Sequence, residues 1–422
     1  MGVSAGKEVK VKRVRVTIDT RPLRIPTYRR LWISTAITAV GSQLTTVAVP
    51  KQVFDLTGSS GFVGLAGAFG LVPLLIFGLW GGALADAFDR RTVILVTNVG
   101  VAATSALFWL FAVVGANVWL VLSLLAVQQA FVAVNMPTRT AAVARLVPPE
   151  LIAPASALSA TVGSFGMVFG PLLAGALMPV AGLPVLYLTD SVALVLAFVL
   201  LFGLPSLSPL DGVKRRAGIK DIADGFRYVA AKNVLLASFL LDIIAMVAGM
   251  PRALFPEMAE RTFGDPHGGG LALGWLYAAI PIGALVFGLL SGWLSHISRQ
   301  GVGVTVAVAA WGLAIVGFGL AHQLWLAIAF LVMAGAADLV SMIYRGAILQ
   351  TATTDEMRGR MQGLFTVVVA GGPRIADLAH GWAAAGVGTA TAATTGGVLV
   401  VVLTAIAVVC LPAFWRYRAT TG

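Results

Sequence analysis

Apolar stretches of about 20 residues recur along the whole chain, and each is long enough to cross the hydrocarbon core of a bilayer as an α-helix. Of the 422 residues, 58% are hydrophobic and only 11% are charged, whereas about 25% are charged in an ordinary soluble domain. The alternating ten-residue pattern of membrane barrel strands is absent. We therefore predict an all-α membrane protein with twelve transmembrane helices, at about residues 31–54, 61–85, 92–114, 118–140, 155–180, 183–204, 234–257, 271–295, 302–320, 324–350, 360–385 and 391–414.

The distribution of basic residues predicts how these helices cross the membrane. If the basic N-terminal segment is cytoplasmic, 23 lysines and arginines fall in inner segments, and only Lys51 and Arg261 fall in outer ones. This asymmetry is typical of a bacterial inner-membrane protein with both termini in the cytoplasm. It accounts for the net charge of +11 without a nucleic-acid partner. The N-terminal segment has no apolar core and is not a cleavable signal peptide.

A polar stretch from Pro205 to Asn233 divides the predicted helices six and six. An offset of about 206 residues aligns the segments that begin at Arg139 and Arg345, so the halves are interpreted as parallel repeats. Such repeats favour an alternating-access transporter with its site between the halves. The expected organisation is a basic cytoplasmic tail, a six-helix bundle, a cytoplasmic linker, a second six-helix bundle and a short tail, at residues 1–30, 31–204, 205–233, 234–414 and 415–422.

Two motifs resemble signatures of the major facilitator superfamily. "GALADAFDRR" resembles the signature G-x-L-A-D-x-x-G-R-R, with Asp89 in place of the usual glycine. In that superfamily the acid helps to lock the halves together, so the resemblance implies a conformational latch. Asp86 with Arg139 is the candidate core of this latch. The full set of candidate latch residues is Gly82, Asp86, Arg90, Arg91, Arg139 and Arg345. "GMVFGPLLAG" resembles the exporter signature G-x-x-x-G-P-x-x-G-G and supplies Gly166, Gly170, Pro171 and Gly175.

The second half sharpens this resemblance. "MPRALFPEMAE", "GWLYAAIPIGALVFGLLSGWLSH" and "LQTATTDEMRGRMQGLFT" are similar to the siderophore exporters of the enterobactin type, a branch that adjoins the macrolide and multidrug exporters. The resemblance implies proton-driven export of a siderophore or a related polar aromatic molecule across the bacterial cytoplasmic membrane. The alternative is a proton-coupled multidrug or macrolide efflux pump.

Ionisable residues inside the predicted helices are the candidate functional groups, because burying a charge in a bilayer is costly. Arg374, Asp377 and His380 stand at three-residue intervals on one helical face. Arg374 is expected to bind substrate or to tune Asp377, and Asp377 to carry the coupling proton. His380 is expected to make a packing hydrogen bond, with proton transfer as the alternative. A static bridge between Arg374 and Asp377 is the competing interpretation.

Further candidates lie on other helices of the second half. Arg252 is expected to bind an acidic or catechol-bearing substrate, with snorkelling to the outer surface as the alternative. Asp242 and Asp338 are candidate proton carriers, and Asp338 also joins the substrate-binding set. Seven residues separate Asp338 from Arg345, a distance judged too long for a direct pair.

Two weaker candidates lie in the first half. Asp190 ranks below the other acids, because the superfamily places its helix at the periphery. Lys51 and Asp55 are expected to form a loose surface bridge.

Other function classes find little support. No zinc-protease pair, phosphate-binding loop or serine elbow occurs, so no enzymatic activity, metal or cofactor is expected. The expected partners are a small-molecule substrate, protons and the lipid bilayer, and the chain is expected to act as a monomer.

Overall fold

A computed structural model describes residues 19–208, 219–292 and 299–417. Within these ranges the regular structure consists of α-helices and short 3-10 helices, without strands, as the apolar pattern predicts. The exposed hydrophobic side chains include Val180, Leu289 and Val409, each about four-fifths exposed at 87%, 81% and 79%. Such surfaces suit contact with lipid rather than water.

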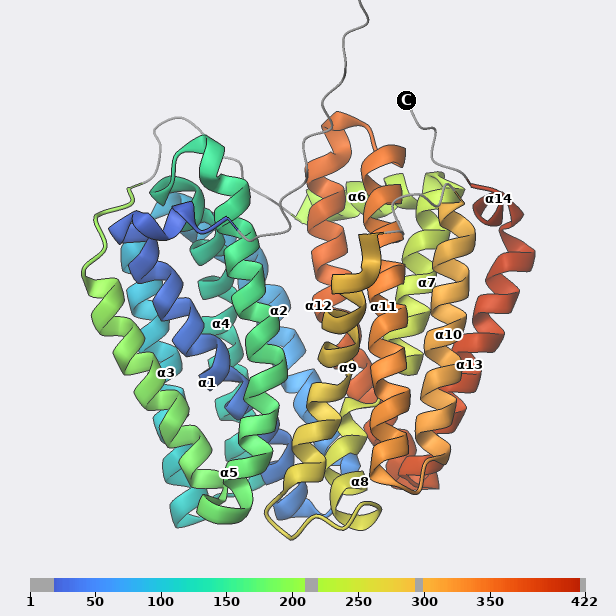
Figure 1. Cartoon of the computed structure of the whole chain (residues 1–422), viewed down its shortest axis with the longest axis horizontal. Helices are drawn as coiled ribbons and strands as arrows, with labels where there is room; N and C mark the ends of the chain where they lie inside the picture. Colours follow the sequence, from blue (N-terminus) through green and yellow to red (C-terminus); the bar gives the residue numbers. More distant parts are fainter. Residues whose placement is uncertain (1–18, 209–218, 293–298, 418–422) are drawn as a thin grey trace, which may run out of the picture.

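The first half of the chain forms five long helices (Figure 1). The last is long enough to cross a membrane twice, and it contains the non-helical residue Gly182, with φ 76° and ψ 170°. This positive φ is readily adopted by glycine, so it divides the helix where the sequence predicts a boundary between two spans. A short 3-10 helix, η1 (Arg21–Arg24), precedes the five, which are α1 (Pro26–Thr57), α2 (Ser60–Ala87), α3 (Arg90–Val114), α4 (Val118–Leu146) and, after η2 (Pro149–Leu151), α5 (Ile152–Phe202).

The second half begins with α6 (Ile219–Ala231), which leads into α7 (Asn233–Gly249). The span predicted at 234–257 is interrupted, because Met250 is extended and precedes Pro251, a position that disfavours the helical conformation. The remaining elements are η3 (Arg252–Leu254), α8 (Phe255–Arg261), α9 (Leu271–Leu290), α10 (Gln300–Leu320), α11 (Leu324–Ala352), α12 (Asp355–Val387), α13 (Thr389–Cys410) and α14 (Pro412–Trp415).

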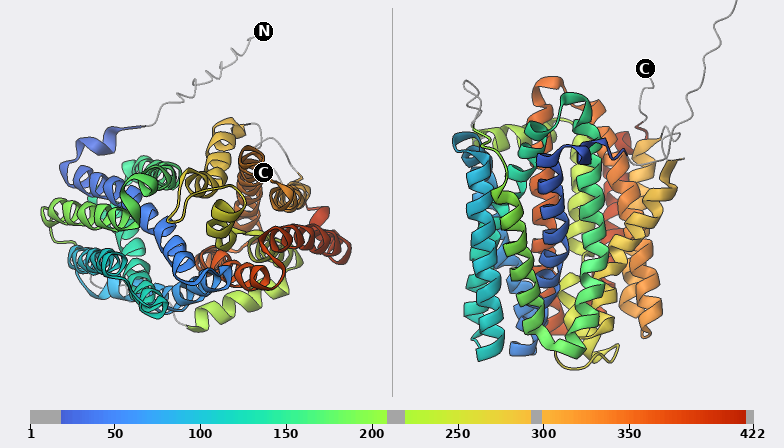
Figure 2. Two further views of the ribbon diagram at one scale, coloured as in Figure 1. Left: turned by 90° about the horizontal axis from the view of Figure 1, so that it is seen from below. Right: turned by 60° about the vertical axis from the view of Figure 1, so that its left-hand side comes forward.

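The helices form two bundles, α1–α5 and α7–α13, which stand side by side in Figures 1 and 2. The bundles meet where α2 packs against α12 and where α5 packs against α9. Ten stretches of the described residues are long and apolar enough to cross a membrane, and one of them is the double-length segment that contains Gly182. Together with α12, this arrangement fits the major facilitator fold.

Among the described residues, buried apolar side chains form a large cluster that runs through both bundles and a second cluster within the first bundle. In the second bundle, the Phe255 ring of the large cluster packs edge-on against Tyr277 and Phe318. Two ends of the molecule can be distinguished by their elements. The α6 end carries α6 and α14, and the α8 end carries α8 and the α1–α2 connection (Figure 1).

Candidate transport site

A cavity of about 280 Å³ lies between the two bundles. Its wall combines apolar side chains with a few polar and charged groups, the composition expected of a small-molecule site. The first bundle contributes Ser42, Thr45, Thr46, Gln128, Gln129 and Asp190 among its polar lining residues, and the second contributes Arg252, Tyr277, Arg374 and Asp377.

α12 presents its polar face to this cavity. Pro373, Arg374 and Asp377 line the wall together, as their spacing predicts. The Arg374 guanidinium donates a hydrogen bond of 2.9 Å to the side-chain oxygen of Gln129 in the other bundle. Among the described residues it forms no ion pair with Asp377, so the static bridge between them is wrong for this state. Asp377 Oδ1 is buried without a hydrogen-bond partner.

Arg252 reaches the same cavity from η3, immediately after the break between α7 and α8. Met250 and Pro251 separate the end of α7 from η3, which begins at Arg252. Arg252 is therefore placed beside Tyr277 and Arg374 in the cavity wall, rather than at the outer surface. His380, on the same helix as Arg374, is buried, and its Nε2 lies 2.9 Å from the Ala248 carbonyl oxygen, the packing hydrogen bond that the sequence predicts.

Asp242, Asp338 and Arg345 form a separate group inside the second bundle. Arg345 is buried, pairs directly with Asp242, and has its Nη2 3.7 Å from Asp338 Oδ1. The expectation that Asp338 lies too far from Arg345 for a direct pair was wrong, because the arginine and aspartate side chains together span the distance along the helix. None of the three lines the cavity. Both acids are thus held by a cation, whereas Asp377 is not.

Among the described residues, the equivalent arginine of the first bundle, Arg139, donates hydrogen bonds to neutral groups. It donates to Asn135 Oδ1 at 2.7 Å, to the Ser34 and Thr35 hydroxyls at 3.1 Å each and to Asn98 Oδ1 at 3.3 Å. The side chains of residues 79–86 lie outside the described part of the structure. The predicted latch between Arg139 and Asp86, and the side-chain environment of Gly82, are therefore not tested.

Asp89, which replaces the signature glycine, has an anchoring role that sequence reasoning missed. Its carboxyl caps α3 by accepting from the Arg91 N–H at 2.8 Å, and it accepts from Ser206 and from the Leu207 N–H. Burial raises the Asp89 pKa, but these hydrogen bonds outweigh burial and hold the pKa below its usual value. Arg91 also donates to the Phe202 carbonyl oxygen at 2.6 Å. The α2–α3 connection is thus tied to the end of α5, while Arg90 begins α3.

The glycines of the exporter motif lie where α5 approaches other helices. A Cβ on Gly166 would come within 2.8 Å of the Ala39 carbonyl oxygen, and one on Gly170 within 2.3 Å of Gln43 Cβ. A Cβ on Gly175 would lie 2.9 Å from Gly274 Cα in the second bundle. Pro171 lies at the same crossing, since its carbonyl oxygen faces Gly274.

The bundles are also joined by polar contacts at the α8 end. Lys51 Nζ lies 2.5 Å from Asp55 on its own helix and 2.5 Å from Glu260 of α8. Lys51 is only 1% exposed, so the expectation of a loose surface bridge was wrong, because the decisive partner lies 209 positions away. Nearby, Ser60 donates to Glu257 at 2.5 Å, and Arg261 donates to the Gly58 carbonyl oxygen at 3.1 Å.

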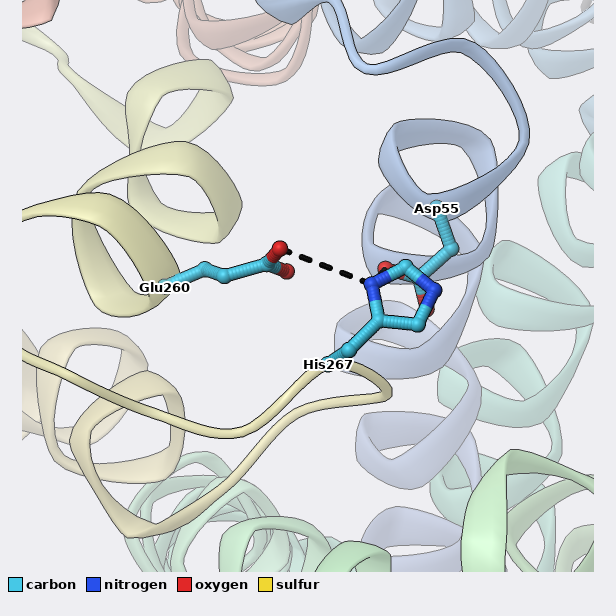
Figure 3. Close-up of side chains that lie close together, drawn as sticks. All are labelled: Asp55, Glu260 and His267. Carbon is cyan, nitrogen blue, oxygen red and sulfur yellow. Dashed lines mark hydrogen bonds and ion pairs between the residues drawn. The ribbon is translucent and has the colours of Figure 1, made fainter.

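Figure 3 shows His267 between Asp55 and Glu260, with its Nδ1 3.5 Å from Glu260 Oε1. The ligand atoms of these three residues lie within 4.8 Å of one another, a spacing that could hold a metal ion. However, the Lys51 ammonium already contacts both carboxylates and supplies the positive charge that a metal would supply. We interpret the group as an ion pair between the bundles.

Comparison with known proteins identifies the class of protein that this fold and cavity define. Residues 18–417 match the family described as "Transmembrane secretion effector", and the chain belongs to this family of major facilitator transporters. The enterobactin exporter EntS of Shigella boydii serotype 4 (strain Sb227) and that of Escherichia coli O139:H28 (strain E24377A / ETEC) are each 28% identical to the chain over 396 residues. These alignments cover 94% of the chain and 94% of each relative.

Solved transporter structures share the fold. The nucleoside transporter NupG superposes with a TM-score of 0.72 at 12% identity, covering 93% of this chain and 100% of the other. A bacterial homologue of the human lysosomal transporter Spinster superposes with a TM-score of 0.67 at 16% identity, covering 96% and 100%. Membership of the family that residues 18–417 match makes the chain a transporter and not an enzyme.

Proposed function

We propose that this protein exports a siderophore of the enterobactin type, or a related polar aromatic molecule, across the bacterial cytoplasmic membrane. Export proceeds by alternating access and proton antiport, in a monomer with both termini in the cytoplasm. The observation that carries the proposal is the similarity to enterobactin exporters along 94% of the chain, combined with a cavity that holds two arginines.

The chemistry of the cavity fits an acidic or catechol-bearing cargo. Arg252 and Arg374 place two guanidinium groups in one wall, where they can donate paired hydrogen bonds to oxygen atoms. Tyr277 and Gln129 add an aromatic surface and an amide beside them. A cationic drug would meet like charge in this wall, which disfavours its binding.

The size of the cavity suits a state in which the site is partly closed. Its volume of about 280 Å³ lies just below the roughly 300–1,000 Å³ that usually holds drug-sized ligands. The contacts of Lys51 and Arg261 join the bundles at the α8 end. With those contacts in place, the larger opening needed by a bulky cargo has to form toward the α6 end, which is the cytoplasmic side in this proposal.

Asp377 is the preferred proton carrier among the acids that the sequence singles out. It lines the cavity without an ion-pair partner, whereas Arg345 holds Asp242 and Asp338. A carboxyl that alternates between a dry and a wet environment changes its proton affinity. Arg374 lies three residues away. When Asp377 is protonated, its carboxyl group no longer competes with the cargo for the Arg374 guanidinium, and Arg374 binds the cargo.

The cargo is tested in an iron-starved host that lacks this gene, by measuring siderophores in medium and cytoplasm with mass spectrometry. The wild-type gene should restore secretion, and Arg252→Met and Arg374→Met should fail to restore it. Arg145→Met removes an exposed arginine outside the cavity and should behave as wild type. Unchanged siderophore secretion in the deletion strain, together with increased sensitivity to macrolides, would replace this proposal with drug efflux.

The coupling is tested with purified protein in liposomes, with enterobactin as the probe. Asp377→Asn should exchange enterobactin between the two sides but should not accumulate it against a gradient when a pH difference is imposed. Full uphill transport by Asp377→Asn, at wild-type protein level, would remove Asp377 from the coupling role.

A further inference from the structure

A second acid, Asp190, lies in the wall of the same cavity, on the first bundle. It belongs to the second span of α5, beyond Gly182. The side chain is only 1% exposed. A peripheral helix was expected to keep Asp190 away from the site, but α5 packs along α1 and brings the carboxyl through to the cavity wall.

The two oxygens of this carboxyl have different surroundings. Oδ2 accepts a hydrogen bond of 2.7 Å from the Thr45 hydroxyl and another of 2.8 Å from the Ser105 hydroxyl. Oδ1 is buried and has no hydrogen-bond partner. A neutral carboxylic acid has this pattern, because its carbonyl oxygen accepts two hydrogen bonds and its hydroxyl remains free to donate.

Local packing leaves room for Oδ1 and leaves the acid without a cation. A Cβ on Gly41 of α1 would lie 2.7 Å from Oδ1, so glycine there leaves room for the oxygen. Among the described residues, Asp190 forms no ion pair, in contrast to the acids near Arg345. An ionised carboxylate that is buried with one bare oxygen and no cation carries a large desolvation cost.

Two neighbouring residues of α4 make separate polar contacts, one with the Asp190 network and one with the second bundle. Gln128 Nε2 donates to the Ser105 hydroxyl at 3.1 Å, so its amide belongs to the Asp190 network. The next residue, Gln129, accepts from Arg374 of α12. Adjacent positions of α4 therefore contact the polar groups around both acids of the cavity, Asp190 on one side and Asp377 on the other.

We infer that Asp190 is protonated in this state and is a second proton-exchanging group of the cavity, supplied by the first bundle. In the exchange, the O–H bond at Oδ1 breaks and the proton passes to water in the cavity; the carboxylate that remains is stabilised by the Thr45 and Ser105 hydroxyls. Reprotonation from the other side of the membrane completes the cycle. The charged groups that share the cavity wall are Arg252, Arg374 and Asp377, while α1, α3 and α4 present hydroxyls and amides.

Infrared spectroscopy of the purified protein in lipid tests the protonation directly and does not depend on what the protein exports. At neutral pH the wild type should show a carbonyl band of a protonated carboxylic acid that Asp190→Asn lacks, and alkaline pH should remove it. Thr45→Val keeps the carboxyl but removes one donor to Oδ2, so it should move this band to higher frequency. No difference band at acidic or neutral pH, or a band that persists at every alkaline pH, would overturn the inference.

A transport measurement completes the test and rests on the proposed proton antiport. Asn at position 190 retains an oxygen for Thr45 and Ser105 but cannot release a proton. Asp190→Asn should therefore exchange enterobactin across liposomes and lose accumulation driven by a pH difference. A purely structural role would lower both activities equally, and full accumulation would exclude proton exchange at Asp190. If the wild type moves no enterobactin, the cargo proposal fails, and the infrared result still decides the protonation of Asp190.

Discussion

Replacing Lys51 by methionine should open the α8 end of the transporter. Lys51 is a buried cation that contacts carboxylates of both bundles, Asp55 of α1 and Glu260 of α8, at 2.5 Å each, closer than the exposed His267. Methionine preserves most of the apolar stem and removes the ammonium. The variant therefore leaves two carboxylates close together without their shared cation, and repulsion between them favours separation of the bundles.

The size of the effect follows from burial. Removing one partner of a fully buried pair costs about 3–5 kcal/mol, whereas a surface pair contributes about 0–1 kcal/mol. Lys51 is fully buried, but the Asp55 and Glu260 side chains are 14% and 26% exposed and can regain water. We therefore expect a loss of about 2 kcal/mol, which corresponds to a shift of about 30-fold in the equilibrium between closed and open α8 ends.

Electron paramagnetic resonance distances between the bundles measure this equilibrium. Spin labels at Val114 and Gln323, both exposed and on different bundles, report the α8 end, and Cys410→Ser removes the native cysteine. Lys51→Met should transfer much of the population to longer distances. Arg261→Met, which removes a more exposed cation at the same end, should shift the equilibrium by less than about fivefold.

Identical distance distributions for wild type and Lys51→Met would refute the reasoning. So would equal shifts in Lys51→Met and Arg261→Met, because burial would then have no influence on the strength of the contact.

Three further predictions concern other parts of the molecule. Gly64→Val should destabilise the closed α8 end by about 1–3 kcal/mol, measured by the same distances, because even a Cβ there would lie 2.4 Å from the Asp377 carbonyl oxygen; unchanged distances would contradict this. Arg345→Leu should destabilise the protein by about 3–5 kcal/mol in thermal unfolding, because it leaves Asp242 buried without its cation. The double variant Arg345→Leu with Asp242→Leu should recover most of this loss. Equal instability of the single and double variants would argue against the pair. The Lys232 ammonium donates to the Tyr228 hydroxyl and lowers the Tyr228 pKa to about 8. Ultraviolet titration of the wild type should therefore show one tyrosine that ionises as pH rises through about 8, and Tyr228→Phe should lack it. Superimposable titrations of the wild type and Tyr228→Phe would exclude this contact.

Much of the fold could be read from local patterns. Apolar runs locate the helices, and the divide at Gly182 falls between two predicted spans, because a membrane helix must satisfy its own backbone and needs a fixed length. The spacing of Arg374 and Asp377 likewise predicts a shared face, and both residues line the cavity. The break at Met250 was missed, although Pro251 was a visible signal for it.

Pairings between distant segments could not be read in this way. Helical spacing places Asp338 and Arg345 about 10 Å apart along the axis, yet the reach of the guanidinium brings them together. Lys51 finds Glu260, and Asp190 meets Thr45 and Ser105, only because separate helices pack against one another.

The sequence by itself determined that this chain is a two-bundle membrane transporter, and which residue types its helices carry into the membrane. These properties depend on periodicity, on length and on the charge of connecting segments, all of which are local. Only the tertiary structure decided which cavity acids keep an oxygen without a hydrogen-bond partner, which acids Arg345 holds, and which lysine joins the two bundles. The physical reason is that the environment of a buried charge is set by atoms from several helices, whose approach depends on packing across the whole molecule.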